Sequence, residues 1–261
     1  YIDYLLLTPW VPCNSNCIYC GVQANKPKTK NNMLGAVKEL IRQGKFKNTG
    51  EITFQGGEPT ILREFDDLLK LFIKQGSKVR IHSSGILFSR AIREGLKQGV
   101  VTVVISPDSV NSDTYKKVKR VDKSNKVWDN IKHYRKNLKE DFQNLVKVKY
   151  IIIPGINDTY EEISEFLNQI KNIDIKSVIV DVEYTYANTN ADKISPHVYI
   201  LMDYIKHFCN ENNISYDLYD SALYADRNRK YEQTTDFSED NLKKQIENYK
   251  SENKNINIKY Y

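Results

Sequence analysis

The chain has 261 residues, a length that suits one sizeable domain with a buried core. Hydrophobic residues make up 40% of it and charged residues 28%, as in an ordinary soluble globular protein, and four cysteines do not indicate a secreted disulfide scaffold. The net charge of +6 is best explained by a lysine-rich solvated surface, and nucleic acid is not expected as a partner because no aromatic–basic platform is present. No apolar run approaches the roughly 20 residues of a membrane span, and the first residues lack a signal peptide's basic leader, so a cytoplasmic protein is expected.

Short apolar runs alternate with longer amphipathic stretches, a pattern typical of parallel strands joined by helices. Right-handed crossovers would wind six such βα units into an α/β fold, an open or partial barrel. Strands are predicted at 4–7, 51–54, 78–82, 100–106, 145–153 and 178–182. Helices are predicted at 33–43, 65–74, 86–97, 127–138, 160–170 and about 196–212.

The last part of the chain differs in composition from the rest. From residue 236 onward it is polar and charged, with a possible helix around 241–249 and an edge strand or frayed end at 256–260. We therefore expect a barrel domain over residues 1–215 and a C-terminal extension over 216–261. The first strand begins almost at residue 1, so the chain could be a domain of a longer protein.

Three cysteines in C-x3-C-x2-C spacing, Cys13, Cys17 and Cys20, follow the first predicted strand. Three is an odd number for disulfides and one short of a closed tetrahedral zinc site. It suits a 4Fe-4S cubane held at three irons, with the fourth iron open for a substrate or cofactor. The alternative is a structural zinc site completed by Cys209 or His82, although no second C-x2-C pair is present.

The cysteine spacing, with the aromatic Tyr19 directly before the third cysteine, resembles the signature of the radical S-adenosylmethionine (radical SAM) enzymes. The resemblance extends over residues 1 to about 215. It implies a partial (β/α)6 TIM-like barrel with a 4Fe-4S cluster at the rim and S-adenosylmethionine lying across the strand ends. It also implies an external one-electron reductant of the flavodoxin or ferredoxin type. The product of reductive cleavage would be a 5′-deoxyadenosyl radical, which abstracts hydrogen from the substrate.

The resemblance assigns cofactor contacts to the ends of the second and third strands. Gly56 and Gly57 would let the methionine amino group approach the backbone, and Glu58 would supply negative charge nearby. Ser83 and Ser84 would bond the carboxylate or the ribose. Taken alone, each of these segments would be an ordinary turn.

At the end of the fourth strand, Ser106 and Asp108 resemble a family motif in which a serine and an aspartate are one residue apart. Both would lie on one face and meet the ribose or the substrate. The family's usual residue after the aspartate is glycine, and here it is Ser109. Lys119, or alternatively Arg120, would face the methionine carboxylate, with ordinary surface charge as the competing interpretation.

The last two strands add further candidates. Ile153 would pack on the adenine, and the following Asn157 and Asp158 are expected to cap the next helix. Asp181 and Glu183 share one face of the sixth strand. They could hold substrate hydroxyls or act as acid or base, or could simply be a solvent-exposed strand end.

Cys209 lies with apolar neighbours on a predicted helix, as core residues do, and its alternative role is donation of a hydrogen atom that quenches a substrate radical. The stretches 104–134 and 148–167 are more weakly similar to radical SAM proteins of sugar and surface-polysaccharide biosynthesis, which implies a small-molecule or sugar-type substrate. Two alternatives stay open. One is a peptide-modifying member without auxiliary clusters, and the other is a non-catalytic, metal-stapled binding domain.

Overall fold

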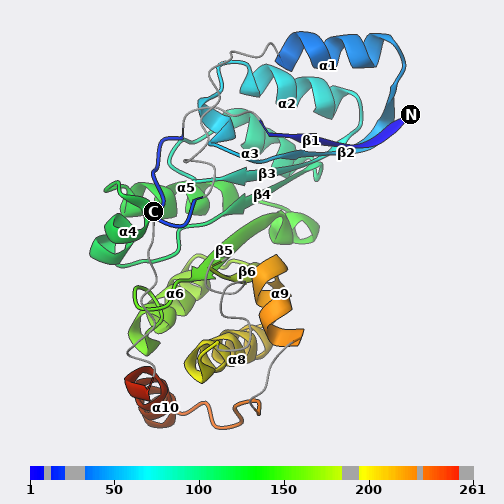
Figure 1. The fold of residues 1–261 in the computed structure, drawn as a ribbon. Helices are drawn as coiled ribbons and strands as arrows, with labels where there is room; N and C mark the ends of the chain where they lie inside the picture. The colour runs from blue at the N-terminus through cyan, green and yellow to red at the C-terminus, as the bar shows by residue number, and fades with distance from the viewer. Residues whose placement is uncertain (9–12, 21–32, 184–193, 228–231, 253–261) are drawn as a thin grey trace. The chain divides into compact units, whose positions relative to one another are not determined.

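The structure is a computed structural model that describes residues 1–8, 13–20, 33–183, 194–227 and 232–252 (Figure 1). Its internal contacts divide the chain into two units. Unit 1 is made of Tyr1–Asn16, Cys20–Ser106 and Lys126–Lys147. Unit 2 is made of Cys17–Tyr19, Pro107–Asn125 and Val148–Tyr261.

Unit 1 contains four parallel strands that pair in chain order: β1 (Ile2–Leu7), β2 (Phe46–Phe54), β3 (Lys78–Ser83) and β4 (Val101–Ile105). Their register places four apolar residues in one row, because Leu7 lies opposite Phe54, Phe54 opposite Ile81, and Ile81 opposite Val103. All four are buried. The register is fixed because a shift by one residue would turn this whole row to the other face.

The helices of unit 1 cover the face that carries this apolar row. The Phe54 ring meets Phe65 and Phe72 of the helix after β2 with ring centroids 5.3 and 6.1 Å apart. At Gly95 a Cβ would lie 2.2 Å from Cγ2 of Val101, so only glycine lets this helix approach β4 so closely. The helices are α1 (Met33–Arg42), α2 (Phe65–Lys74), α3 (Arg90–Lys97) and α5 (Ser124–Arg135), with short 3-10 turns at Pro59–Ile61 and Glu140–Leu145.

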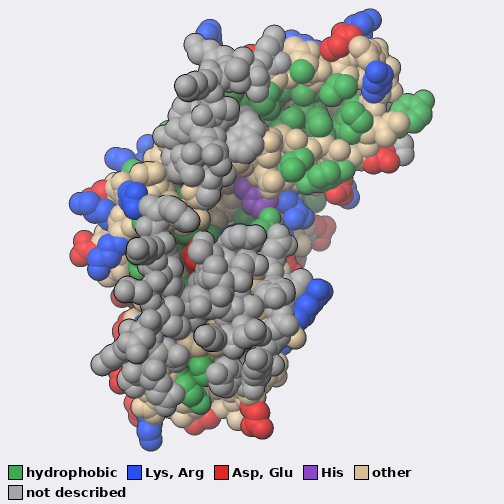
Figure 2. Space-filling model, in the orientation of Figure 1, with side chains coloured by type: hydrophobic (Ala, Val, Ile, Leu, Met, Phe, Trp, Pro, Cys, Tyr) green, Lys and Arg blue, Asp and Glu red, His purple; other side chains and the backbone are tan. Residues whose placement is uncertain are grey.

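The other face of β1 carries exposed apolar side chains. Tyr4 and Leu6 are 53% and 43% exposed, although Leu7 beside them is buried. In the space-filling view, hydrophobic side chains gather over this part of unit 1 (Figure 2). The alternation along β1 shows that its two faces have different surroundings within the unit.

Unit 2 is also an α/β arrangement, built on the parallel strands β5 (Val146–Ile152), β6 (Ser177–Val182) and β7 (Ser215–Leu218). Ile152 lies opposite Val182, and Val180 lies opposite Leu218. The first two residues of β5 belong by their contacts to unit 1. The helices are α4 (Ser112–Lys119), α6 (Tyr160–Asn172), α8 (Pro196–Glu211), α9 (Asp220–Arg227) and α10 (Glu239–Glu252), of which α10 packs on α6 and α8.

The predicted α/β class is confirmed, and all six predicted strands form. The structure adds a seventh strand, β7, which the sequence analysis did not predict. Helix α3 begins four residues later than predicted because Ser89 caps it, its Oγ accepting from the Ile92 N–H at 3.2 Å. The expected strand at 256–260 lies outside the described residues, and the domain boundary at residue 215 stays a prediction. Among the described helices, none has the length and apolar character needed to cross a membrane.

Candidate functional site

The three predicted cluster ligands lie in one segment, Cys13–Cys20, which we call the thiol loop. Cys13, Cys17 and Cys20 are half-buried and are not joined in disulfides. Within the described ranges, no three His, Cys, Asp or Glu side chains are gathered as they would be around a metal ion. The alternative of a zinc site completed by Cys209 or His82 stays a prediction.

The thiol loop is hydrogen-bonded to the end of β3 through Asn14. Ser84 Oγ donates to Asn14 Oδ1 at 2.9 Å. The other end of this amide, Asn14 Nδ2, is buried and has no hydrogen-bond partner in the described structure. A buried donor without an acceptor is costly, so this amide is suited to hold an acceptor group of a ligand. A sulfide or a carboxylate beside Cys13 would supply the acceptor.

Glu58 connects the end of β2 to the end of β3. It is 1% exposed, and its Oε1 accepts from the N–H and hydroxyl of Thr60 at 3.1 and 2.5 Å and from Ser83 Oγ at 2.8 Å. Its Oε2 accepts from the Ser84 N–H at 2.5 Å. Gly56 precedes it with φ +106°, a conformation that favours glycine. Glu58, Ser83 and Ser84 thus form one hydrogen-bonded rim within unit 1, which Gly56 and Gly57 directly precede in the chain.

Asp108, Lys119 and Tyr19 come together in unit 2. The Asp108 carboxylate is fully buried, forms an ion pair with Lys119, and accepts from the Tyr19 hydroxyl at 2.6 Å. Lys119 Nζ also donates to the Tyr19 hydroxyl at 2.7 Å. Burial lowers the pKa of Lys119, but the charge of Asp108 outweighs it and the net pKa is raised. Lys119 is 3% exposed, so the surface-charge interpretation is wrong; its contact with the methionine carboxylate stays a prediction.

The serine that replaces the family's glycine fits the turn after β4. The left-handed residue is Asp108, with φ +58°, and not Ser109. Ser109 Oγ donates to Glu162 Oε2 at 2.7 Å. The Asp108 backbone carbonyl accepts from Asn157 Nδ2 at 2.8 Å, which supports the strained turn. Ser106 is half-buried at the end of β4.

The expectation that Asn157 and Asp158 cap α6 is wrong. Thr159 is the N-cap, and its side chain accepts from the Glu162 N–H at 3.2 Å. Asn157 is fully buried and bonds to backbone groups of the β4 and β5 loops instead. Ile153, the predicted adenine contact, is buried in a cluster with Ile18, Val118 and Ile151, against which Tyr19 packs; its role toward adenine stays a prediction.

The carboxylates at the end of β6 are not a solvent-exposed strand end, because Asp181 is 8% and Glu183 2% exposed. Asp181 Oδ2 accepts from Lys149 Nζ at 2.8 Å, and this ammonium also lies 4.1 Å from the centroid of the Tyr219 ring. The second carboxylate oxygen, Oδ1, accepts from the Ala222 N–H at 3.3 Å. The sequence analysis missed Lys149, although it lies inside an apolar strand where a lone charge needs a partner.

Cys209 is completely buried in α8, and burial raises the pKa of its thiol to about 12. This placement agrees with the expected core position. Its alternative role as a hydrogen-atom donor stays a prediction.

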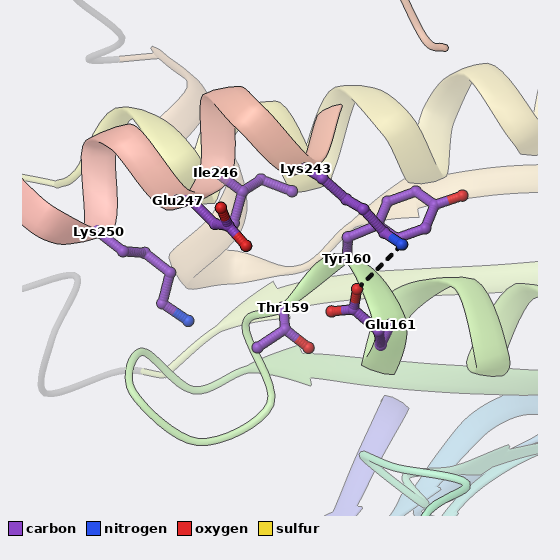
Figure 3. Close-up of a pocket in the computed structure, with 7 residues that line it drawn as sticks. All are labelled: Thr159, Tyr160, Glu161, Lys243, Ile246, Glu247 and Lys250. Carbon is purple, nitrogen blue, oxygen red and sulfur yellow. Dashed lines mark ion pairs between the residues drawn. The ribbon is translucent and has the colours of Figure 1, made fainter. Parts of the chain in front are cut away.

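Two cavities contain residues that the sequence analysis did not single out. One, of about 440 Å³, lies between α6 and α10, where Lys243 Nζ is 3.4 Å from Glu161 (Figure 3). The other, of about 460 Å³, follows the Glu58 rim in unit 1 and is lined by Thr60, Arg63 and Arg90 among others. Basic residues directly after the Gly-Gly-Glu-Pro segment were the available sequence signal for the second cavity.

A buried ionic chain next to the first cavity gives a pH prediction. Asp158 accepts from His197 Nε2 at 2.8 Å and from Lys250 Nζ at 2.7 Å. Burial raises the pKa of Asp158, but the hydrogen bonds and charges of these two partners outweigh burial and lower the pKa to about 2. Because this pKa lies below the unfolded value, the carboxylate stabilises the fold above pH ~4, and its contribution of about 2 kcal/mol is lost as the pH falls toward 2.

We therefore expect Asp158→Asn to lower the free energy of unfolding by about 2 kcal/mol at pH 6 and to flatten its pH dependence below pH ~4. Urea titrations between pH 2 and 6 measure this. Asp129→Asn, a change at an exposed aspartate, is the control and should follow the wild type. Parallel pH profiles for Asp158→Asn and wild type would contradict the assignment.

The parallel α/β fold, with three cysteine thiols in a loop after the first strand, fits the class of cysteine-ligated α/β cluster proteins. A family model described as the radical SAM superfamily matches residues 8–170. The chain belongs to the radical SAM superfamily, whose members are enzymes that use a 4Fe-4S cluster and S-adenosylmethionine. The donor set fits such a cluster, because three thiols are available and a buried amide donor lies beside them.

The chain is also similar to named proteins. The GTP 3′,8-cyclase of Clostridium acetobutylicum is 28% identical over 186 residues, which cover 69% of this chain and 56% of that protein. Molybdenum cofactor biosynthesis protein 1 of Dictyostelium discoideum is 29% identical over 197 residues, covering 73% of this chain and 30% of that protein. The chain thus spans about half the length of the cyclase that it matches, so the activity of the whole protein is a matter for proposal.

A solved structure has the same fold. Streptococcus suis SuiB bound to its precursor peptide SuiA superposes with a TM-score of 0.66 at 18% identity, covering 84% of this chain and 49% of SuiB. The expected partial TIM-like barrel of the radical SAM enzymes is confirmed by this likeness. None of the relatives described here is named for sugar or polysaccharide biosynthesis, so the weaker resemblance to such proteins is not supported.

Proposed function

We propose that this chain is the catalytic barrel of a radical SAM enzyme that abstracts hydrogen from a small-molecule substrate. The observation that carries the proposal is the thiol loop with its buried, unpartnered Asn14 Nδ2, hydrogen-bonded through Ser84 to the Glu58 rim. The loop supplies three ligands, and the rim supplies polar groups for a ligand at the strand ends.

The cysteines and Glu58 would have different roles in such an enzyme. Cys13, Cys17 and Cys20 would hold three irons, leaving the fourth for the amino and carboxylate groups of S-adenosylmethionine. When bound, the cluster supplies the electron that cleaves the cofactor's sulfonium bond. Glu58 is already bonded to Ser83 and Ser84, so it would shape the glycine turn and add negative charge toward the methionine amino group.

The substrate proposed for the first test is a purine nucleoside triphosphate. The support is the similarity to proteins named GTP 3′,8-cyclase, combined with the cavity beside the Glu58 rim that contains Arg63 and Arg90. Arginine suits phosphate because its guanidinium can donate two hydrogen bonds at once. An acidic one-electron carrier of the flavodoxin or ferredoxin type would supply the electron.

The test is anaerobic reconstitution with iron and sulfide, reduction, and addition of S-adenosylmethionine with and without GTP. We expect an electron paramagnetic resonance signal that shifts with the cofactor, and 5′-deoxyadenosine as a product. Alanine at Cys13, Cys17 or Cys20 should remove both, whereas Cys209→Ala is the matched control and should keep its iron. A silent spectrum with stoichiometric zinc would overturn the proposal. If 5′-deoxyadenosine formed equally with and without GTP, only the proposed substrate would be excluded, and the radical SAM activity would stand.

A further inference from the structure

The hydrogen bonds around Tyr19 connect the thiol loop to two charged residues that lie about 90 and 100 positions later in the sequence. Tyr19 donates its hydroxyl hydrogen to Asp108 at 2.6 Å and accepts from Lys119 at 2.7 Å, and Lys119 and Asp108 are themselves paired. The Lys119 ammonium also lies 5.2 Å from the centroid of the Tyr19 ring. All three residues belong to unit 2, together with Cys17 and Ile18.

The two charged partners are held in place from several sides. Asp108 Oδ1 accepts from the Ile151 N–H at 3.1 Å, so each carboxylate oxygen has a donor. Lys119 is the last residue of α4, which is capped at its start by Asn111. The side chains of the pair are 4% and 0% exposed. A buried pair that is bonded this completely has a fixed geometry, because removing either charge leaves the other unpaired in a low-dielectric site.

The backbone of the loop is also attached to α4. The Ile18 N–H donates to the Val118 carbonyl at 3.0 Å, one residue before Lys119. Ile18 packs with Val118, Ile151 and Ile153 in one buried cluster. The segment from Cys17 to Tyr19 is therefore attached to α4 and β5 by one main-chain bond, one apolar cluster and one polar group, the Tyr19 hydroxyl.

We propose that Tyr19, Asp108 and Lys119 form a buried clamp that positions the Cys17–Tyr19 segment of the thiol loop, and that they act on the cluster through this segment rather than by contacting S-adenosylmethionine. This inference rests on the proposed function, because it concerns the same cluster. Lys119 has its carboxylate partner inside the protein. Arg120, the alternative candidate for the cofactor carboxylate, is exposed.

The first measurement uses the chain without any cluster. Tyr19→Phe keeps the ring but removes the hydroxyl, and it should increase the rate of amide hydrogen exchange of residues 17–19 by about 10-fold. Lys119→Met should do the same, and the double variant should add little because both changes break one clamp. Lys116→Met, at an exposed lysine of the same helix, is the control and should exchange like the wild type. Wild-type exchange in Tyr19→Phe would overturn the clamp, even if Lys119→Met failed to fold.

The second measurement uses the reconstituted protein. Tyr19→Phe and Lys119→Met should lose iron to a chelator about 10-fold faster than wild type, as changes around metal ligands typically do, while the affinity of the loaded protein for S-adenosylmethionine stays unchanged. Weaker cofactor binding in Lys119→Met with normal iron retention would show that Lys119 is a cofactor ligand and would overturn the inference. If the wild type takes up no cluster, the proposed function fails, and the exchange experiment still decides whether the clamp exists.

Discussion

Replacing Glu58 with glutamine is expected to weaken both the fold of unit 1 and its binding of S-adenosylmethionine. The carboxylate accepts from two N–H groups and two hydroxyls at the ends of β2 and β3. A glutamine of the same shape would place its NH₂ donor against a donor already present, which is the Ser84 N–H or the Thr60 N–H depending on the orientation of the amide. Hydrogen bonds to a charged group contribute about 2 kcal/mol each, so we expect the free energy of unfolding to fall by about 2 to 3 kcal/mol.

The cofactor effect follows from the same geometry. If the rim receives S-adenosylmethionine, a disordered rim should weaken its binding by about 10-fold, which corresponds to roughly 1.4 kcal/mol. Urea unfolding and equilibrium binding on reconstituted protein measure the two effects. The matched control is Glu51→Gln, at an exposed position of β2. A Glu58→Gln variant with wild-type stability would mean that the four bonds to the carboxylate do not hold the rim together.

The second large effect is expected at Lys149. Its ammonium is the charged partner of Asp181, and both side chains are 11% exposed. Lys149→Met would leave the carboxylate unpaired between β5, β6 and α9, and breaking a pair of this kind costs about 3 kcal/mol or more. The double variant Lys149→Met/Asp181→Leu removes both charges and should recover much of the loss, because the carboxylate no longer needs a partner.

A surface pair provides the control for this prediction. Lys176 lies 2.6 Å from Asp174, but both side chains are over a third exposed, and Lys176→Met should change the free energy of unfolding by about 0.5 kcal/mol or less. Urea titrations of the three variants and wild type give the comparison. If Lys149→Met is as mild as Lys176→Met, the carboxylate of Asp181 is solvated and the pair does not stabilise unit 2.

The alternation of strands and helices was predictable because each element has a local pattern of apolar residues. Apolar runs marked β2 through β6, and helical spacing marked α1, α2 and α6, since these elements bury continuous faces. β7 was missed because Ser215–Leu218 is only four residues long and lacks an apolar run. The start of α3 was placed too early because apolar residues 86–88 continue the helical spacing, whereas the cap at Ser89 decides where the helix begins.

The polar partners were not predictable from local sequence, because they come from distant parts of the chain. The thiol loop was recognised from its spacing, and the glycine rim from its place after a strand. The pairing of Asp108 with Lys119 spans 11 residues, and that of Tyr19 with Asp108 spans 89. Asn157 has a side chain suited to capping, but tertiary contacts use it elsewhere. Such pairs are fixed by how strands and helices pack, and strand alternation alone does not give them.

The complete burial of Cys209 has a practical consequence for chemistry carried out on this protein. A thiol inside α8 with a pKa near 12 is screened from alkylating reagents while the chain is folded, whereas the three half-buried loop thiols are within their reach. Mass-spectrometric counting of labelled sulfurs therefore separates two populations in one sample. Three labels per chain indicate an open, metal-free loop on an intact fold, and a fourth label indicates global unfolding. The number of labels therefore measures the quality of each preparation.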